Sequence, residues 1–295
     1  MTAGFESWMK AVQADMENAL AQHLPATAQA PQRLHEAMRY AVLDGGKRVR
    51  PLLVFAAGAL FEADKTELAR AAAAVEMIHA YSLVHDDMPC MDDDALRRGK
   101  PTVHVKYDEA TALLVGDALQ SQAFEVLSAG VLPPQRQLAM VRLLAQASGS
   151  LGMCGGQAID LASVGLQLSL EQLEQMHRLK TGALLRASVL LGALTGKDLS
   201  DGETQALDAY ARAIGLAFQV VDDVLDATAD SATLGKTAGK DAADNKPTYV
   251  SILGLEASRA LAEKLCADAH RALEQFGEHA RHLRDIADLI VQRKA

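Results

Sequence analysis

Hydrophobic residues recur every three or four positions along nearly the whole chain. This spacing predicts helices, and no alternating pattern of useful length indicates a strand. The predicted helices span residues 5–23, 31–44, 51–61, 66–87, 106–129, 134–148, 169–195, 201–228, 248–275 and 279–293. Glycine and proline pairs typical of turns lie between them, at Gly45-Gly46, Pro133-Pro134 and Gly155-Gly156. The pattern therefore predicts an all-α fold.

Some of the predicted helices are apolar around most of their circumference. The segment ARAAAAVEMIHAYSLV, residues 69–84, has no continuous polar face, which is typical of a helix at the centre of a bundle. No linker, fixed-period repeat or low-complexity segment divides the chain. We therefore expect a single domain over residues 1–295, folded as one large helical bundle.

The composition supports this fold class. Hydrophobic residues make up 49% of the 295 residues but aromatic residues only 4%, and the abundant Ala and Leu favour helices over strands. The formal net charge of −9 argues against a nucleic-acid-binding protein, which would present a basic face. A local basic pocket for an anionic small molecule is still compatible with this charge.

The sequence also indicates where the protein works. Cys90, Cys154 and Cys266 are odd in number, far apart and without a CxxC pair, so we expect a reducing compartment and neither a disulfide framework nor a zinc site. The N-terminal segment lacks the layout of a signal peptide, and no apolar stretch approaches the roughly 20 residues of a membrane span. We expect a cytoplasmic protein without membrane insertion.

Asp86 and Asp87 begin the first of two acidic clusters. Their helix should end here because Pro89 disfavours helical geometry at Met88, so both carboxylates lie at the negative end of the helix dipole. Two like charges about 4 Å apart repel by roughly 4 kcal/mol at an effective dielectric near 20, and Asp92–Asp94 follow in the same segment. Either a cation occupies this site or one aspartate is protonated.

The second acidic cluster lies in VVDDVLD, residues 220–226. Asp222 and Asp226, four residues apart, share one face of an otherwise apolar helix. Either cluster alone could be a solvated acidic face or a capped helix end. Facing one another, the two clusters would form an all-oxygen site for a hard cation, Mg²⁺ in the first place and Mn²⁺ as an alternative. The spacing does not match an EF-hand calcium loop.

Basic residues near both clusters are candidates for binding an anion. They include a Gly-Gly-Lys-Arg helix start, where free N–H groups and cations favour anions. Each basic group could also be present for a reason unrelated to anion binding. The Gly-Gly-Lys-Arg segment could be an ordinary helix start, and the arginines could form salt bridges with neighbouring aspartates. Lys180 could extend to solvent along an apolar surface, and the loop lysines could simply be solvated. His79 would by default be a core histidine. The cationic candidates are Lys47, Arg48, Arg50, Arg97, Arg98, Lys180, Lys236, Lys240 and Lys246.

These segments together resemble the short-chain trans-prenyltransferases of the polyprenyl synthetase family, and bacterial farnesyl diphosphate synthases in particular. The resemblance covers almost the whole chain, and the pair of aspartate-rich motifs is highly specific. It implies a bundle of the isoprenoid-synthase type with a central cavity, usually in a homodimer. The matching segments are GGKRVRP (45–51), HDDMPCMDDDALRRGKPT (85–102), GGQAIDL (155–161), LKTGAL (179–184), FQVVDDVLD (218–226) and LGKTAGKDAADNKPTY (234–249).

The resemblance assigns roles to individual residues. Three Mg²⁺ ions with substrate bound would be held by Asp86, Asp92 and Asp222, with Asp87 and Asp226 in support. The diphosphate of isopentenyl diphosphate would be bound by Lys47, Arg50, His79 and Arg98. The allylic diphosphate would be bound by Arg97, Lys180, Lys236 and Lys246. Thr181 and Gln219 resemble positions near the reacting carbons, where their oxygens stabilise a carbocation.

The activity that this resemblance implies is head-to-tail condensation of isopentenyl diphosphate with dimethylallyl and geranyl diphosphate. Metal ions and basic side chains would neutralise the charge that develops on the leaving diphosphate. The allylic cation is then attacked by the double bond of isopentenyl diphosphate, and a proton is lost to the departing diphosphate. This chemistry agrees with the lack of a recognisable Ser-His-Asp or Cys-His set in the sequence.

Tyr81 and Ser82 are the candidates for setting product length, because in this family the residues upstream of the first motif line the channel. Helical spacing puts Tyr81 about one turn below Asp86, so its ring can close the cavity and favour the C15 farnesyl product over C20. Alternatively, Tyr81 is a core residue with no effect on length. A geranylgeranyl or geranyl diphosphate synthase is therefore the nearest alternative.

Two alternatives come from other classes of protein. A non-catalytic helical subunit of a prenyl synthase should have lost aspartates or arginines from its motifs, and both motifs are intact here. A metal-dependent phosphohydrolase, suggested by His85-Asp86, would need further histidine ligands at suitable positions, and the nine histidines form no such set in the sequence.

Overall fold

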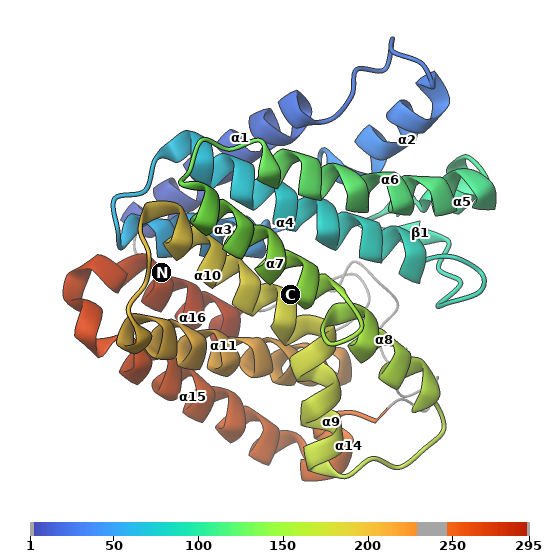
Figure 1. Cartoon of the computed structure of the whole chain (residues 1–295). Helices are drawn as coiled ribbons and strands as arrows, with labels where there is room; N and C mark the ends of the chain where they lie inside the picture. The colour runs from blue at the N-terminus through green and yellow to red at the C-terminus, as the bar shows by residue number, and fades with distance from the viewer. Residues whose placement is uncertain (1–2, 229–246, 294–295) are drawn as a thin grey trace.

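Long helices account for most of the structure (Figure 1). The computed structural model describes residues 3–228 and 247–293. The first half contains α1 (Ala3–His23), α2 (Gln32–Val42), α3 (Val49–Ala59), α4 (Lys65–Asp86), α5 (Val103–Lys106), α6 (Glu109–Ser128) and α7 (Pro134–Ser148). The second half contains α8 (Met153–Ala162), α9 (Leu170–His177), a π-turn (Arg178–Gly182), α10 (Ala183–Gly196), α11 (Asp201–Thr228), α14 (Tyr249–Leu253), α15 (Leu255–Ala272), a 3₁₀ turn (Glu274–Ala280) and α16 (Arg281–Gln292). Within the described ranges, strands occur only as β1 (Leu96–Arg97) and β2 (Lys100–Pro101), which form a short antiparallel hairpin.

The predicted all-α class is confirmed, and most predicted helices agree with the structure to within a few residues. One prediction was wrong: Gly155-Gly156 does not end a helix but lies inside α8. A Cβ atom on Gly156 would lie 2.0 Å from the backbone nitrogen of Lys180, and one on Gly155 would lie 2.0 Å from the Ser150 oxygen. The glycines are needed for close packing of backbones rather than for a turn.

Helix α4 lies in the middle of the bundle, in contact with α3, α6 and α10 (Figure 1). Its N-terminus is capped by Asp64, whose carboxylate accepts hydrogen bonds from the backbone N–H groups of Thr66 and Glu67. The run Ala71–Ala74 is fully buried, and these small side chains let helices approach from several sides. The buried helix predicted for residues 69–84 is confirmed, and its last turn carries Asp86.

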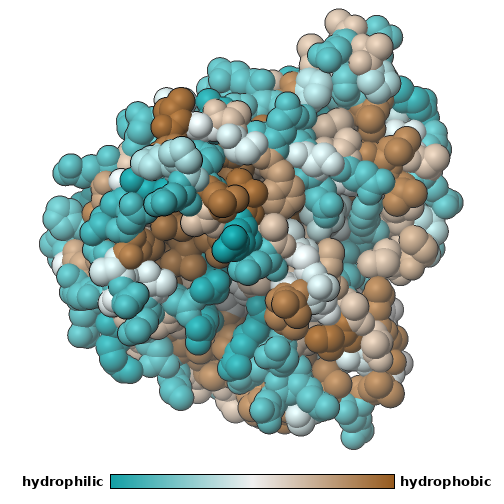
Figure 2. Space-filling view, in the orientation of Figure 1, coloured by the Kyte–Doolittle hydropathy of each residue, from teal (hydrophilic) through white to brown (hydrophobic). Residues whose placement is uncertain are grey.

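One hydrophobic core contains residues from Phe5 in α1 to Ile290 in α16. A smaller cluster, with Leu173, Val220 and Tyr249, joins α9, α11 and α14. The face shown in Figure 2 is mostly polar, with separate patches of hydrophobic residues. Among the described residues, no helix is both long and apolar enough to cross a membrane.

Arg48 is the buried charge that fixes the segment before α3. Its backbone has a φ of 53°, and its guanidinium hydrogen-bonds to Glu76 at 2.6 Å, to Glu17 at 2.5 Å and to the Val42 carbonyl at 2.7 Å. Only 2% of the side chain is exposed, as is 3% of Glu76. The prediction that Arg48 contributes to an anion site was therefore wrong, because two carboxylates of the protein already neutralise it.

Replacing Arg48 with methionine tests this ion pair. Arg48→Met leaves Glu76 as a buried carboxylate without its cation, so we expect the free energy of unfolding to fall by roughly 3–5 kcal/mol. Urea unfolding measures the change. The control is Arg33→Met, which removes an exposed pair with Asp108 and should cost less than about 1 kcal/mol. Equal effects of the two variants would contradict the role of Arg48.

Candidate active site

A cavity of about 350 Å³ is lined by residues near the end of α4, from α8 and from the π-turn. Its lining includes polar and charged side chains, whereas Met91, Met153 and Leu161 contribute apolar surface. Such a cavity can bind the charged and apolar ends of one ligand. Seven of the predicted site residues line it, namely Arg50, His79, Tyr81, Ser82, Asp86, Lys180 and Thr181.

Asp86 ends α4 and Asp87 caps it, as the position of Pro89 predicts. Burial raises the pKa of Asp86 to about 6; nearby Lys180 opposes this rise and the charge of Asp92 adds to it. The loop folds back, so that the Asp92 N–H donates to the Asp86 carbonyl at 2.9 Å. The acidic segment is therefore closely packed, and its ionised form is destabilised unless a cation is present.

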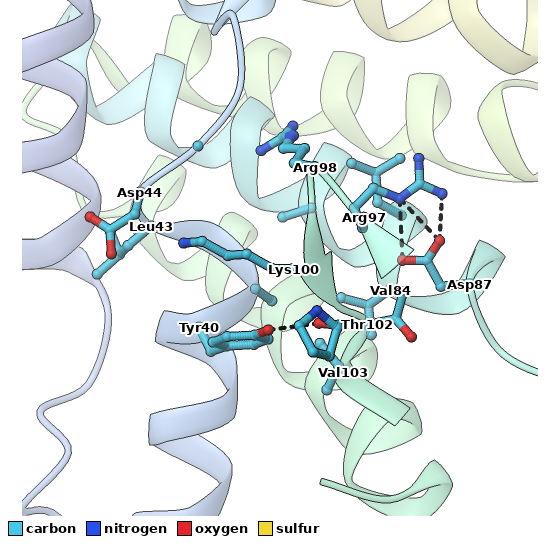
Figure 3. A pocket seen from close by; sticks show the side chains of 15 residues that line it. Tyr40, Leu43, Asp44, Val84, Asp87, Arg97, Arg98, Lys100, Thr102 and Val103 are labelled. Carbon is cyan, nitrogen blue, oxygen red and sulfur yellow. Dashed lines mark hydrogen bonds and ion pairs between the residues drawn. The ribbon is translucent and has the colours of Figure 1, made fainter. Parts of the chain in front are cut away.

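Arg97 and Arg98 are adjacent in sequence but point in different directions (Figure 3). Arg97 pairs with Asp87, with 3.0 Å between the arginine Nε and one carboxylate oxygen. Burial raises the pKa of Asp87, and this ion pair only partly offsets the rise. Arg98 points away from Asp87 and packs on Gly46, where a Cβ atom would lie 2.7 Å from the guanidinium carbon. Both arginines line a smaller cavity of about 60 Å³ beside the hairpin.

Arg50 gives the cavity a positive charge, and His79 lines the same cavity. Burial lowers the pKa of Arg50 to about 10, with Glu76 opposing this effect and Arg98 adding to it. The Arg50 Nε is buried without a hydrogen-bond partner among the described residues. Burial and the adjacent Arg50 and Arg98 hold the pKa of His79 well below its usual value, so His79 is neutral. Cations crowded in this way favour binding of an anion.

The π-turn brings Lys180 and Thr181 to the cavity wall. The Lys180 ammonium pairs with Asp160 of α8, and the Thr181 hydroxyl donates to the side-chain amide oxygen Oε1 of Gln219 at 2.7 Å. Turns of this kind occur frequently at functional sites. Thr181 and Gln219 therefore lie together, and neither this contact nor the partner of Lys180 was predicted from the sequence.

Asp222, in the second acidic cluster, faces a cation that the sequence patterns did not reveal. Arg293 hydrogen-bonds to it at 2.8 Å, and the Arg293 guanidinium lies 3.9 Å from the centre of the Phe218 ring. Burial lowers the pKa of Lys47, an effect that Arg293 increases and Asp222 opposes. Asp223 instead accepts a hydrogen bond from the Tyr249 N–H at 2.7 Å, so the aspartates of this motif have different roles.

Three residues important in the site were missed by sequence reasoning. Gln157 and Asp160 both lie in α8 within the segment GGQAIDL, where no helix was predicted. Both polar side-chain atoms of Gln157 are buried without a hydrogen-bond partner among the described residues. Arg293 follows α16, and only the tertiary structure brings it to Asp222. Lys236, Lys240 and Lys246 lie outside the described residues.

The aspartates that would hold Mg²⁺ come from separate elements: Asp86 from α4, Asp92 from the following loop and Asp222 from α11. Their carboxylates do not form a set of three within 4.8 Å of one another. This arrangement fits Mg²⁺, which binds through one or two carboxylates and keeps waters or substrate phosphates as its other ligands. The residues present therefore suit a hard cation that arrives with a diphosphate.

Fold and site together define the class: a helical protein of the isoprenoid-synthase fold, with a cavity suited to a diphosphate and an apolar tail. The family model for polyprenyl synthetase matches residues 31–286, and the chain belongs to this family. A farnesyl diphosphate synthase of Escherichia coli is 52% identical over 264 residues, which cover 88% of each protein. The large subunit of a heterodimeric geranylgeranyl pyrophosphate synthase of Arabidopsis thaliana is 53% identical over 253 residues, covering 83% of this chain and 68% of that protein.

The fold of this chain is also similar to solved structures of prenyl synthases. The apo structure of an FPP/GFPP synthase from Zymomonas mobilis superposes with a TM-score of 0.88 and 45% identity. The match covers 99% of this chain and 100% of that chain. The arrangement of helices around the cavity is therefore shared with an enzyme of this family over its whole length.

The raised pKa of Asp86 predicts how stability depends on pH without metal. The folded-state pKa of about 6 exceeds the unfolded value of about 3.9, so ionisation destabilises the folded form and stability falls as pH rises through this range. In EDTA at pH 7 we expect Asp86→Asn to unfold at a higher urea concentration than the unmodified protein. Near pH 3, below both pKa values, the difference should vanish.

Asp15→Asn is the matched control, since Asp15 is exposed on α1. It should leave the urea midpoint unchanged at both pH values. A lower midpoint for Asp86→Asn at pH 7 would show that this carboxylate stabilises the metal-free fold, contrary to the expectation.

Proposed function

We propose that this protein is a farnesyl diphosphate synthase, which condenses isopentenyl diphosphate head-to-tail with dimethylallyl and then geranyl diphosphate. The observation that carries the proposal is one cavity whose lining combines the cations Arg50 and Lys180 with the apolar surface of Met153 and Leu161. Such a lining complements a substrate with an anionic diphosphate head and an apolar prenyl tail. The family of the chain supports the same class of transferase.

The basic side chains can bind two diphosphates in different ways. Arg50 and Arg98 have no ion-pair partner among the described residues, so they can bind isopentenyl diphosphate without first breaking a salt bridge. Neutral His79 can donate or accept a hydrogen bond there. Arg97 and Lys180 are held by Asp87 and Asp160, and these carboxylates fix their side chains beside Asp86. The allylic diphosphate therefore meets cations whose positions are already set.

Asp86, Asp92 and Asp222 would hold the Mg²⁺ ions, with Mn²⁺ as an alternative metal. When bound, these ions supply Lewis-acid stabilisation of the leaving diphosphate. The chain's own residues do the rest. The hydrogen-bonded pair Thr181 and Gln219 places oxygen lone pairs beside the cavity, where they stabilise positive charge on the allylic carbons, and the apolar wall limits access of water.

Tyr81 supports the C15 product. Only 5% of the residue is exposed, and its hydroxyl lies 3.5 Å from the Cys154 sulfur across the cavity. The ring and the α8 side chains thus restrict the space below Asp86. Geranylgeranyl diphosphate synthase is the second candidate, because the Arabidopsis relative is as similar in sequence as the E. coli one. Geranyl diphosphate as final product would require an even shallower cavity.

Incubation with labelled isopentenyl diphosphate, dimethylallyl or geranyl diphosphate and Mg²⁺ tests the activity. We expect a C15 diphosphate as the main product and no turnover in EDTA. Asp222→Asn should reduce kcat by at least about tenfold, as expected when a metal ligand is lost. No condensation product with either starter would refute the proposal, and a C20 or C10 product would select one of the alternatives.

Shortening Tyr81 should lengthen the product. Tyr81→Ala removes the ring that closes the cavity, so the C15 intermediate can extend further and accept another isopentenyl unit. We expect C20 diphosphate to become a major product in chromatography of the dephosphorylated prenyl alcohols. The control is Tyr107→Ala at the end of α5, outside the cavity lining. Unchanged C15 output from Tyr81→Ala would remove Tyr81 as the length-determining residue.

The single domain over residues 1–295, the homodimer and the cytoplasmic location stay predictions. Exposed hydrophobic residues on α5, α6 and α7, among them Val105, Leu114 and Leu138, are compatible with a surface that a second copy covers. Pairing of such surfaces is the usual way in which symmetric dimers form.

A further inference from the structure

Helices α15 and α16 bring three metal-ligating side chains together in a groove separate from the prenyl cavity. Cys266 and His270 lie one turn apart on α15, and Asp288 reaches them from α16. The Asp288 Oδ1 lies 2.9 Å from the His270 Nε2 and 3.4 Å from the Cys266 Sγ. All three donor atoms lie within 4.8 Å of one another, and no other described set of three or more such donors does.

These separations suit tetrahedral coordination. Ligands bound at about 2.0–2.3 Å lie about 3.4 Å apart around a tetrahedral zinc ion. The Cys266–Asp288 distance already has this value, and the His270–Asp288 pair needs only a few tenths of an ångström of separation. The site is half-buried and lines an open groove, so a water molecule can supply the fourth ligand.

We propose that Cys266, His270 and Asp288 bind a divalent cation of the zinc class and thereby join α15 to α16. A thiolate, an imidazole and a carboxylate form a borderline-soft donor set that favours Zn²⁺ and disfavours Mg²⁺. The proposed site therefore differs in chemistry as well as position from the aspartates of the prenyl cavity. The cysteine spacing in the sequence argued against a zinc site and could not reveal this one, because the third ligand comes from another helix.

The charges around the groove are compatible with a bound cation. Two of its cationic neighbours have other partners: Arg271 pairs with Asp268 at 3.0 Å, and Arg284 donates to the Gly277 carbonyl at 2.8 Å. Glu263 and Glu274 add negative charge to the same groove. Burial and the adjacent Asp288 raise the pKa of Cys266 to about 11, so the metal must displace the thiol proton, as zinc does when it binds cysteine.

Metal binding at this site would affect the position of a residue in the second aspartate motif's surroundings, Arg293. Asp288 lies five residues before Arg293, which pairs with Asp222 in the second aspartate motif. A cation that holds Asp288 to α15 would also fix the end of α16 from which Arg293 extends. The proposal itself does not depend on the prenyltransferase activity, since none of the three ligands lines the prenyl cavity.

Cobalt(II) is the probe, because a thiolate ligand gives Co²⁺ a charge-transfer absorption band that carboxylate sites lack. The full-length protein is titrated with Co²⁺ in excess Mg²⁺, which fills the aspartate sites. We expect a thiolate–cobalt band in the unmodified protein and in the Cys90→Ser control, its loss in Cys266→Ser, and at least about tenfold weaker binding in His270→Gln and Asp288→Asn. Competition with Zn²⁺ should remove the band.

Thermal unfolding gives a second readout that does not need cobalt. Zn²⁺ should raise the Tm of the unmodified protein, because a ligand that binds only the folded form stabilises it, and should leave that of Cys266→Ser unchanged. Circular dichroism confirms that each variant is folded. A band that persists in Cys266→Ser, or no thiolate–cobalt band and no Zn²⁺-dependent Tm shift in the unmodified protein, would overturn the proposal.

Discussion

The cost of burying charge in an apolar helical bundle governs this structure. Asp86 ends α4 and Arg50 lies in the first turn of α3, and most other residues of these two helices are buried in the core, where low polarity disfavours ionised side chains. The protein neutralises some of these charges internally, as with Arg48 between Glu17 and Glu76. Asp86 and Arg50 instead keep a perturbed pKa, and both line the cavity. The charges that are neutralised internally stabilise the fold, whereas the charges that line the cavity are available to a ligand.

Arginines that are close in sequence differ in whether they stabilise the fold or are available to a ligand. Arg48 is buried and fully paired, whereas Arg50, two positions later, points into the cavity. Arg97 is bound by Asp87, whereas Arg98 packs on Gly46 and stays open to an incoming anion. In each pair of arginines, one side chain fixes the local backbone through its ion pairs and the other can bind substrate. The fixed backbone limits the positions that the second side chain can adopt.

The fold and most of the cavity could be predicted from the sequence, because helical periodicity and the two aspartate motifs are local patterns. Tyr81, Asp86 and Thr181 lie where helix geometry and the family resemblance placed them. Predictions went wrong where a residue type has two uses. Gly155-Gly156 looked like a turn but allows close packing of α8 on the π-turn, and Arg48 looked like an anion ligand but is an internal counter-ion. Arg293 and Asp288 could not be found at all, since only tertiary contacts between distant helices give them their partners.

The contact between Tyr81 and Cys154 places a thiol that can be chemically modified in the wall of the cavity. The Cys154 thiol is exposed yet lies beside the ring that limits the depth of the pocket. A prenyl chain long enough to reach that depth must pass close to this sulfur. The rate at which a small alkylating reagent modifies Cys154 is therefore a direct gauge of how far the occupant of the cavity extends, and it can be read without following turnover.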